Sequence, residues 1–215
     1  MYEMIVFDLD GTLLNTLDDL WAAVNAALGK YNLPLRTKEE VRNFIGNGIV
    51  KLMQRAVGYK HPNFDGILTE FKTYYGEHCA DKTRPYDGIM SLLETLQSKK
   101  IKLAVLSNKA DFAVKMLAES YFKGIFDAAV GENEAAGIRK KPAPDSLIAV
   151  MQQFNVAKEK TLYVGDSEVD IQTANNAGVA CLSVTWGFKD EKFLLENGAT
   201  QLAHSPHEIL CVCGE

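Results

Sequence analysis

The sequence has little of what marks secreted, membrane-spanning or polyanion-binding proteins. Its 215 residues include four cysteines, which are too few and too irregularly spaced for a disulfide scaffold. The chain does not open with a basic segment followed by a long apolar core, and no apolar run comes near the roughly 20 residues that cross a bilayer. We therefore expect a cytoplasmic protein with reduced thiols and no membrane partner.

Charge of one sign is not concentrated anywhere along the chain. With 23 Lys and Arg against 28 Asp and Glu, the formal net charge is -5 and the two signs are mixed. Nucleic-acid-binding proteins usually carry a basic stripe, so we expect no nucleic-acid partner. A small anionic substrate stays compatible with this composition, because a local cluster of lysines and backbone N–H groups can bind it.

Short apolar runs alternate with helical patterns and predict an α/β fold. The runs lack a clean polar alternation, which is typical of strands buried on both faces. They are Met4–Phe7, Ile101–Leu106, Ala128–Val130, Thr161–Val164 and Ala180–Thr185. Strands that alternate with helices form a Rossmann-like parallel sheet, and ligands bind such sheets beyond the carboxyl ends of the strands.

One long segment interrupts this alternation. Residues 15–85 contain no buried-strand run, and their apolar residues recur at helical spacing, as in Leu17, Leu20, Val24 and Leu28. We interpret the segment as an inserted helical domain, with residues 1–14 and 86–215 forming the α/β core. The alternative is that these helices pack directly on the sheet.

Carboxylates follow two of the predicted strands. Asp8 and Asp10 leave the first strand, and Asp166 and Asp170 follow the strand that ends at Val164. Asp166 fits the N-cap of a following helix, with Asp170 one turn into it. Capping explains one acid, but not two acidic clusters at one sheet edge. Converging carboxylates repel one another, and Mg²⁺ is the cation that suits carboxylates, waters and a substrate phosphate.

Two further segments carry groups that bind phosphate oxygens. Ser107 and Asn108 follow another strand, and Lys141 lies before a proline-stiffened turn. Each is weak alone, because Ser-Asn is a common turn and a basic loop is often only solvated. In combination, they favour phosphate chemistry with a carboxylate nucleophile.

In order, these residues resemble the motifs of the haloacid dehalogenase-like hydrolases, in the phosphatase branch with a helical cap. The matching segments are Asp8-Leu9-Asp10-Gly11-Thr12, Ser107-Asn108, Lys141-Pro142 and Gly165-Asp166-Ser167 with Asp170. The resemblance implies that Asp8 is the nucleophile and a Mg²⁺ ligand. It implies that Asp10 is the general acid/base and binds the metal through its main-chain carbonyl.

The resemblance extends to the remaining positions of the motifs. It implies that Ser107 and Lys141 hold the phosphoryl group, and that Asp166 and Asp170 bind the metal directly or through water. Gly11, Thr12 and Asn108 are expected to contact the substrate.

Within this family, the segments 10–20, 41–57 and 141–145 resemble the phosphoglycolate phosphatases. The expected substrate is therefore a small phosphorylated metabolite, with phosphoglycolate first, and the expected assembly is a monomer or homodimer. The core motifs leave other readings open: a sugar-phosphate mutase of the beta-phosphoglucomutase kind, or a pyrophosphatase. A non-enzymatic alternative is a receiver module that is phosphorylated on an aspartate.

Overall fold

The computed structural model describes residues 1–214. Their backbone contacts divide the chain into two compact units. One unit joins Met1–Leu14 to the residues from Pro85 onward, and the other is Asn15–Arg84. The chain passes between the units at β2 (Leu14–Asn15) and β3 (Arg84–Pro85), which pair as a two-stranded sheet.

The first unit is built on a parallel sheet. Among the described residues it has six strands in the order β5-β4-β1-β6-β7-β8, and every neighbouring pair is parallel. The strands are β1 (Met4–Phe7), β4 (Lys102–Ala110), β5 (Ala128–Glu132), β6 (Thr161–Gly165), β7 (Ala180–Val184) and β8 (Leu202–Ala203). This confirms the predicted α/β fold. The two-residue strands β2, β3 and β8 escaped prediction because they are too short to show a pattern.

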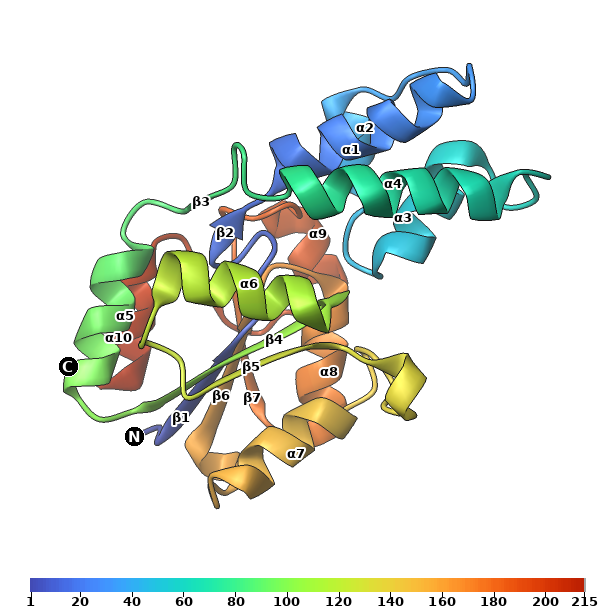
Figure 1. Cartoon of the computed structure of the whole chain (residues 1–215). Helices are drawn as coiled ribbons and strands as arrows, with labels where there is room; N and C mark the ends of the chain where they lie inside the picture. The colour runs from blue at the N-terminus through green and yellow to red at the C-terminus, as the bar shows by residue number, and fades with distance from the viewer. Residues whose placement is uncertain (215) are drawn as a thin grey trace. The chain divides into compact units, whose positions relative to one another are not determined.

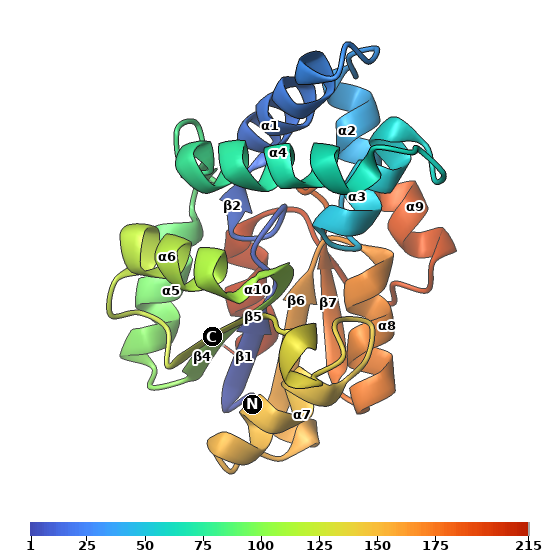
Figure 2. The ribbon, with the colours of Figure 1, turned by 45° about the vertical axis from the view of Figure 1, so that its right-hand side comes forward.

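Helices cover both faces of this sheet (Figures 1 and 2). The helices of this unit are α5 (Ile89–Ser98), α6 (Asp111–Phe122), α7 (Asp145–Gln153), α8 (Glu168–Ala177), α9 (Glu191–Glu196) and α10 (Pro206–Cys213), with the short turns η1 (Glu134–Ala136) and η2 (Lys158–Lys160). Ile5 and Phe7 of β1 pack with residues of α5, α6 and α10. Met4 and Val6 pack with residues of α7 and α8. The period of two along a strand thus gives each face its own apolar core.

Strand β4 is longer than predicted and irregular at its end. The sequence placed its end at Leu106, but the strand continues to Ala110. Its register with β5 shifts between Leu106 and Ala110. An irregularity of this kind re-aims side chains at the end of a strand. Here the consecutive polar residues Ser107, Asn108 and Lys109 are all buried.

The second unit is helical. Its helices are α1 (Leu17–Lys30), α2 (Lys38–Phe44), α3 (Ile49–Val57) and α4 (Phe64–His78). Their apolar residues at helical spacing are buried, among them Leu20, Val24, Leu52 and Phe71. Polar groups tie the unit together as well: Asp19 accepts hydrogen bonds from the backbone N–H groups of Lys82 and Thr83 at 2.8–3.0 Å.

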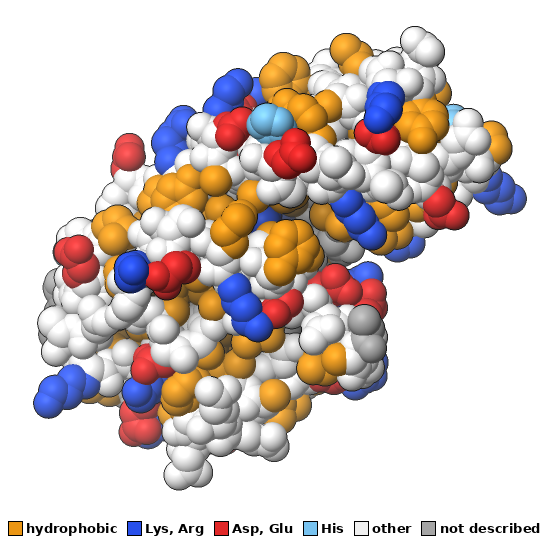
Figure 3. Space-filling model, viewed as in Figure 1, with side chains coloured by type: hydrophobic (Ala, Val, Ile, Leu, Met, Phe, Trp, Pro, Cys, Tyr) orange, Lys and Arg blue, Asp and Glu red, His pale blue; other side chains and the backbone are white. Residues whose placement is uncertain are grey.

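The visible surface carries both signs of charge. In Figure 3, Lys and Arg are interspersed with Asp and Glu, and no continuous basic stripe crosses this face. Within residues 1–214, none of the helices combines the length and apolar character that crossing a bilayer requires.

Candidate active site

The predicted site residues lie where the strand order of the sheet reverses. β1 lies between β4 and β6, and Phe7 is in register with both Val105 and Val164. Ser107, Asp8 and Asp166 follow those three positions closely along their own strands, so they reach the same edge. This is the switch point at which open parallel sheets bind ligands.

Three carboxylates from two strand ends converge there. Asp8, Asp166 and Asp170 each offer an oxygen within 4.8 Å of the others, and all three side chains are buried. The sequence predicted that these acids share one sheet edge, and the structure brings them together.

Burial makes this cluster electrostatically expensive. Loss of water raises the pKa of Asp8 to about 7, with the charges of Asp170 and Asp10 acting in the same direction and Lys141 opposing them. Burial, helped by Asp170 and Asp8, also holds the pKa of Asp166 well above its ordinary range. Both shifts have the sign expected of acids that need a cation nearby in order to stay ionised.

Lys141 forms an ion pair with the nucleophile candidate, Asp8. Its ammonium lies 3.0 Å from Asp8 Oδ1, donates to Asp170 Oδ1 at 2.7 Å, and donates to the Tyr163 hydroxyl at 3.0 Å. Burial acts to lower the pKa of Lys141, but the charges of Asp170 and Asp8 outweigh it and hold that pKa well above its usual value. The lysine is therefore charged and held in place from three directions.

The preceding cations do not enter the site. Arg139 makes two hydrogen bonds to Asp145 at 2.7 and 2.9 Å, and Lys140 pairs with Glu134 at 2.9 Å; the Arg139 side chain is largely exposed. Of the three consecutive basic residues, only Lys141 turns inward.

Asp170 is anchored at both oxygens. Its Oδ2 accepts from the N–H and hydroxyl of Ser167 at 3.1 and 2.6 Å, and its Oδ1 accepts from Lys141. Ser167 is the residue that caps α8, so the expectation that Asp166 is the N-cap is wrong. The cap forms one residue later, at Ser167, and the Asp166 carboxylate accepts from the Phe188 N–H instead.

Asp166 is fitted between glycines. Its Oδ2 accepts from the Phe188 N–H at 2.6 Å. A Cβ atom added to Gly11 would lie 2.2 Å from that oxygen, and one added to Gly187 would lie 2.4 Å from it. Gly11 also has a φ of +87°, a conformation that side chains disfavour. Only glycine leaves room for the acid at these two positions.

Asp10 belongs to a second ion pair. Lys109 donates to both of its carboxylate oxygens, at 2.8 and 3.0 Å, and the Lys109 side chain is 3% exposed against 15% for Asp10. The sequence assigned Asp10 to the site, but it gave no role to Lys109.

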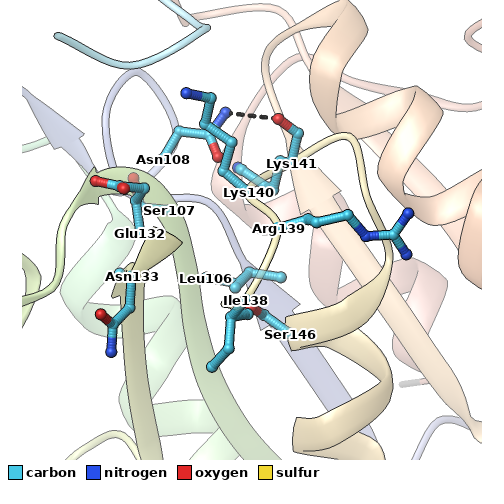
Figure 4. A pocket seen from close by; sticks show the side chains of 11 residues that line it. Leu106, Ser107, Asn108, Glu132, Asn133, Ile138, Arg139, Lys140, Lys141 and Ser146 are labelled. Carbon is cyan, nitrogen blue, oxygen red and sulfur yellow. Dashed lines mark hydrogen bonds between the residues drawn. The ribbon is translucent and has the colours of Figure 1, made fainter. Parts of the chain in front are cut away.

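The remaining predicted residues, Ser107, Asn108 and Thr12, differ in their surroundings. Figure 4 shows the Asn108 amide donating to the main-chain carbonyl of Lys141, at 3.0 Å, beside a pocket that Ser107 also lines. Thr12 is fully buried, and its carbonyl accepts from the Trp186 indole at 3.1 Å. Among the described residues, its hydroxyl has no hydrogen-bond partner.

The residues at this edge fit a hard divalent cation. Asp8, Asp10, Asp166 and Asp170 face Lys109 and Lys141, so the cluster has a formal charge of -2 when all six groups are ionised. Oxygen ligands in a buried, negatively charged setting suit Mg²⁺. Asp8, Asp166 and Asp170 are the residues that could hold such a cation, and both oxygens of Asp170 already accept hydrogen bonds from Ser167 and Lys141.

Sequence reasoning missed Lys109, Tyr163, Gly187 and Phe188. Lys109 directly follows the Ser107-Asn108 motif, and Tyr163 is a polar residue inside the apolar run that became β6. These two positions could have been recognised from the sequence as candidate site residues. Nothing local marked Gly187 and Phe188, because only the fold brings the segment after β7 against Asp166.

Known proteins match this chain over most of its length. The family model described as haloacid dehalogenase-like hydrolase matches residues 5–184. The chain belongs to the haloacid dehalogenase-like hydrolases. This confirms the resemblance on which the site was first assigned.

Relatives within this family are similar along most of their length. A phosphoglycolate phosphatase of Haemophilus influenzae (strain 86-028NP) is 36% identical over 197 residues, which cover 87% of each chain. A phosphoglycolate phosphatase of Pseudomonas putida is 34% identical over 86% of this chain and 70% of its own.

Solved structures of the family agree with the fold. A crystal structure from Lactobacillus delbrueckii subsp. bulgaricus superimposes with a TM-score of 0.95 at 37% identity, covering 100% of this chain and 99% of the other. That of a predicted phosphoglycolate phosphatase from Haemophilus somnus has a TM-score of 0.91 at 30% identity, covering 99% and 98%.

Proposed function

We propose that this hydrolase is a Mg²⁺-dependent phosphatase that cleaves a small phosphomonoester through an aspartyl-phosphate, with phosphoglycolate as the first candidate substrate. The observation that carries the proposal is the convergence of Asp8, Asp166 and Asp170 with Lys141 at the switch point of the sheet. Family membership makes the chain a hydrolase, and its relatives named above are phosphatases.

In the first half-reaction, a carboxylate oxygen of Asp8 attacks phosphorus and the bond from phosphorus to the ester oxygen breaks. Asp10 gives its proton to the departing alkoxide. Lys141 and the Ser107 hydroxyl bind the phosphoryl oxygens as charge shifts onto them. A bound Mg²⁺ would lower the repulsion between the phosphate and the attacking carboxylate.

In the second half-reaction, water attacks the phosphorus of the aspartyl-phosphate. Asp10, now ionised, accepts a proton from that water, so the acyl-phosphate bond breaks and inorganic phosphate leaves with Asp8 restored. Splitting the reaction in this way replaces one difficult displacement by two easier ones. The helical unit, residues 15–84, is the proposed cap that excludes bulk water.

Phosphate release measured over a panel of phosphorylated metabolites tests the proposal. With Mg²⁺, we expect the highest kcat/KM on phosphoglycolate, above pyrophosphate and hexose phosphates, and no turnover after the metal is removed with a chelator. Rates that survive chelation would contradict the metal requirement, and a flat profile would contradict the substrate. A requirement for a bisphosphate activator would instead favour the mutase.

A further inference from the structure

The two buried lysines of the site form ion pairs with different carboxylates. Lys141 contacts Asp8 and Asp170, on the side of the nucleophile. Lys109 binds both oxygens of Asp10, on the side of the general acid/base. The proposed mechanism assigns a role to Lys141 but none to Lys109.

Lys109 occupies a buried position in which its charge is paired. It lies in the irregular end of β4, where the register with β5 shifts, and its side chain is 3% exposed. A buried ammonium is costly unless it is paired and hydrogen-bonded. Its ammonium donates to both carboxylate oxygens of Asp10, at 2.8 and 3.0 Å, and this pair of hydrogen bonds restrains rotation of the carboxyl group about the Cβ–Cγ bond.

The orientation of the Asp10 carboxyl group matters for its role as general acid. A general acid must lie within hydrogen-bond distance of the ester oxygen with its proton aimed at it. Asp10 is part-buried and directly precedes Gly11, which has a positive φ. A single hydrogen bond would leave a carboxyl group at this position free to rotate about its Cβ–Cγ bond. A two-point contact from a rigid strand supplies that restraint.

Given the proposed function, on which this rests, we propose that Lys109 is a positioning residue that holds the Asp10 carboxyl group for proton transfer to the leaving alkoxide. It acts through Asp10 and does not bind the phosphate. Its contribution therefore depends on how much help the leaving group needs. An alkyl ester such as phosphoglycolate needs a proton on its oxygen, whereas the p-nitrophenolate of p-nitrophenyl phosphate leaves without one.

The test compares Lys109→Met with the wild type on both substrates in the presence of Mg²⁺. On phosphoglycolate, kcat/KM should fall about 10²-fold, and on p-nitrophenyl phosphate less than about threefold, because general acid catalysis is worth roughly 10²–10⁴ and only the first substrate uses it. This parameter reports the steps up to release of the alcohol, so it leaves out the second half-reaction, which is the same for both substrates and in which Asp10 acts as the base. Asp10→Asn should show the same dependence on leaving group, and adding Lys109→Met to it should cause no further loss.

Lys102→Met is the matched control. Lys102 lies on the same strand and pairs with Asp127 at 2.7 Å, but its side chain is 48% exposed. It should leave both activities unchanged. The rise in melting temperature on adding MgCl₂ should be the same in Lys109→Met as in the wild type, which shows that the metal site is intact. If Lys109→Met does not fold, Lys109→Gln replaces it in the same comparison.

Equal losses on the two substrates would overturn the proposal, since they would mean that Lys109 binds the phosphate or only supports the fold. Unchanged turnover of phosphoglycolate, or losses that multiply in the double variant, would overturn it as well. Failure of the wild type to release phosphate from either compound would count against the proposed function itself, before any variant is compared.

Discussion

Both units of the chain bury charged side chains fully or in part, but they stabilise these charges differently. In the helical unit, the buried carboxylate of Asp19 accepts from the backbone N–H groups of Lys82 and Thr83. Arg55 donates at 2.6 Å both to the carbonyl of Phe44 and to the Asn47 side chain. These charges are matched to partners that the same unit supplies.

In the sheet unit, acids outnumber the cations that face them. Burial and mutual repulsion raise the pKa of Asp8 to about 7 and that of Asp166 well above its usual range. The contrast teaches that a buried charge with fixed partners serves the fold, whereas the unbalanced cluster has the charge that the cation and substrate of the proposed function require. Variants of the cluster in the sheet unit should therefore lose activity and keep stability, whereas variants of the buried charges in the helical unit should lose stability.

The largest effect is expected from Asp8→Asn, which removes the nucleophile. Turnover of phosphoglycolate should fall by roughly 10³-fold or more, since loss of a covalent nucleophile leaves only residual binding catalysis. Burial raises the pKa of this acid, so its ionised form lowers the stability of the fold, a cost fully present above pH 7 and relieved as the pH falls toward the ordinary value of 3.8.

It follows that Asp8→Asn without metal should melt no lower than the wild type at pH 8. Calorimetry at pH 8 and pH 5 checks the sign, because the advantage of the variant should shrink at the lower pH. If Asp8→Asn loses stability as well as activity, this would contradict the proposed difference between buried charges that serve the fold and those that serve the site.

Gly187→Ala should come next, because the added methyl group would crowd Asp166. Its Cβ would lie 2.3 Å from Asp166 Cβ, so the acid must shift, and a misplacement of about 1 Å within an active site costs roughly 10²-fold in rate. The rise in melting temperature with MgCl₂ should shrink in parallel. Gly29→Ala in α1 meets nothing within 4 Å and serves as the control, with activity unchanged.

Asp19→Ala tests the other side of the comparison. It removes the acceptor of two backbone N–H groups, and we expect the free energy of unfolding to fall by about 3 kcal/mol, in the range for loss of a buried, charged hydrogen-bond partner. Urea unfolding measures the loss, and hydrogen exchange at the amides of Lys82 and Thr83 locates it. Unchanged exchange at those amides would show that the contacts carry no energy.

The smallest effect is expected at the start of α2, where Thr37 caps the helix. Its hydroxyl accepts from the Glu40 N–H at 3.2 Å, and Glu40 accepts in return from the Thr37 N–H at 2.8 Å. Thr37→Ala should cost about 1 kcal/mol of unfolding free energy, as N-cap losses do. A loss as large as that of Asp19→Ala would mean that burial is not what separates the two positions.

The sequence by itself determined the parallel sheet, because strands buried on both faces leave runs such as Met4–Phe7 that no helix pattern explains. It also determined which acids gather at one edge, since the carboxyl ends of parallel strands point the same way. The segments that carry Asp8, Ser107, Lys141 and Asp166 each have a local signature of their own.

Only the tertiary structure decided how those acids are held. The Phe188 N–H reaches Asp166 across 22 residues of chain, and Lys109 reaches Asp10 across 99. In the sequence, Tyr163 is part of an apolar run, but in the structure its hydroxyl accepts a hydrogen bond from Lys141. Such contacts are made between segments far apart in the chain, so no local pattern of residues encodes them; packing brings the partners together and fixes their distances.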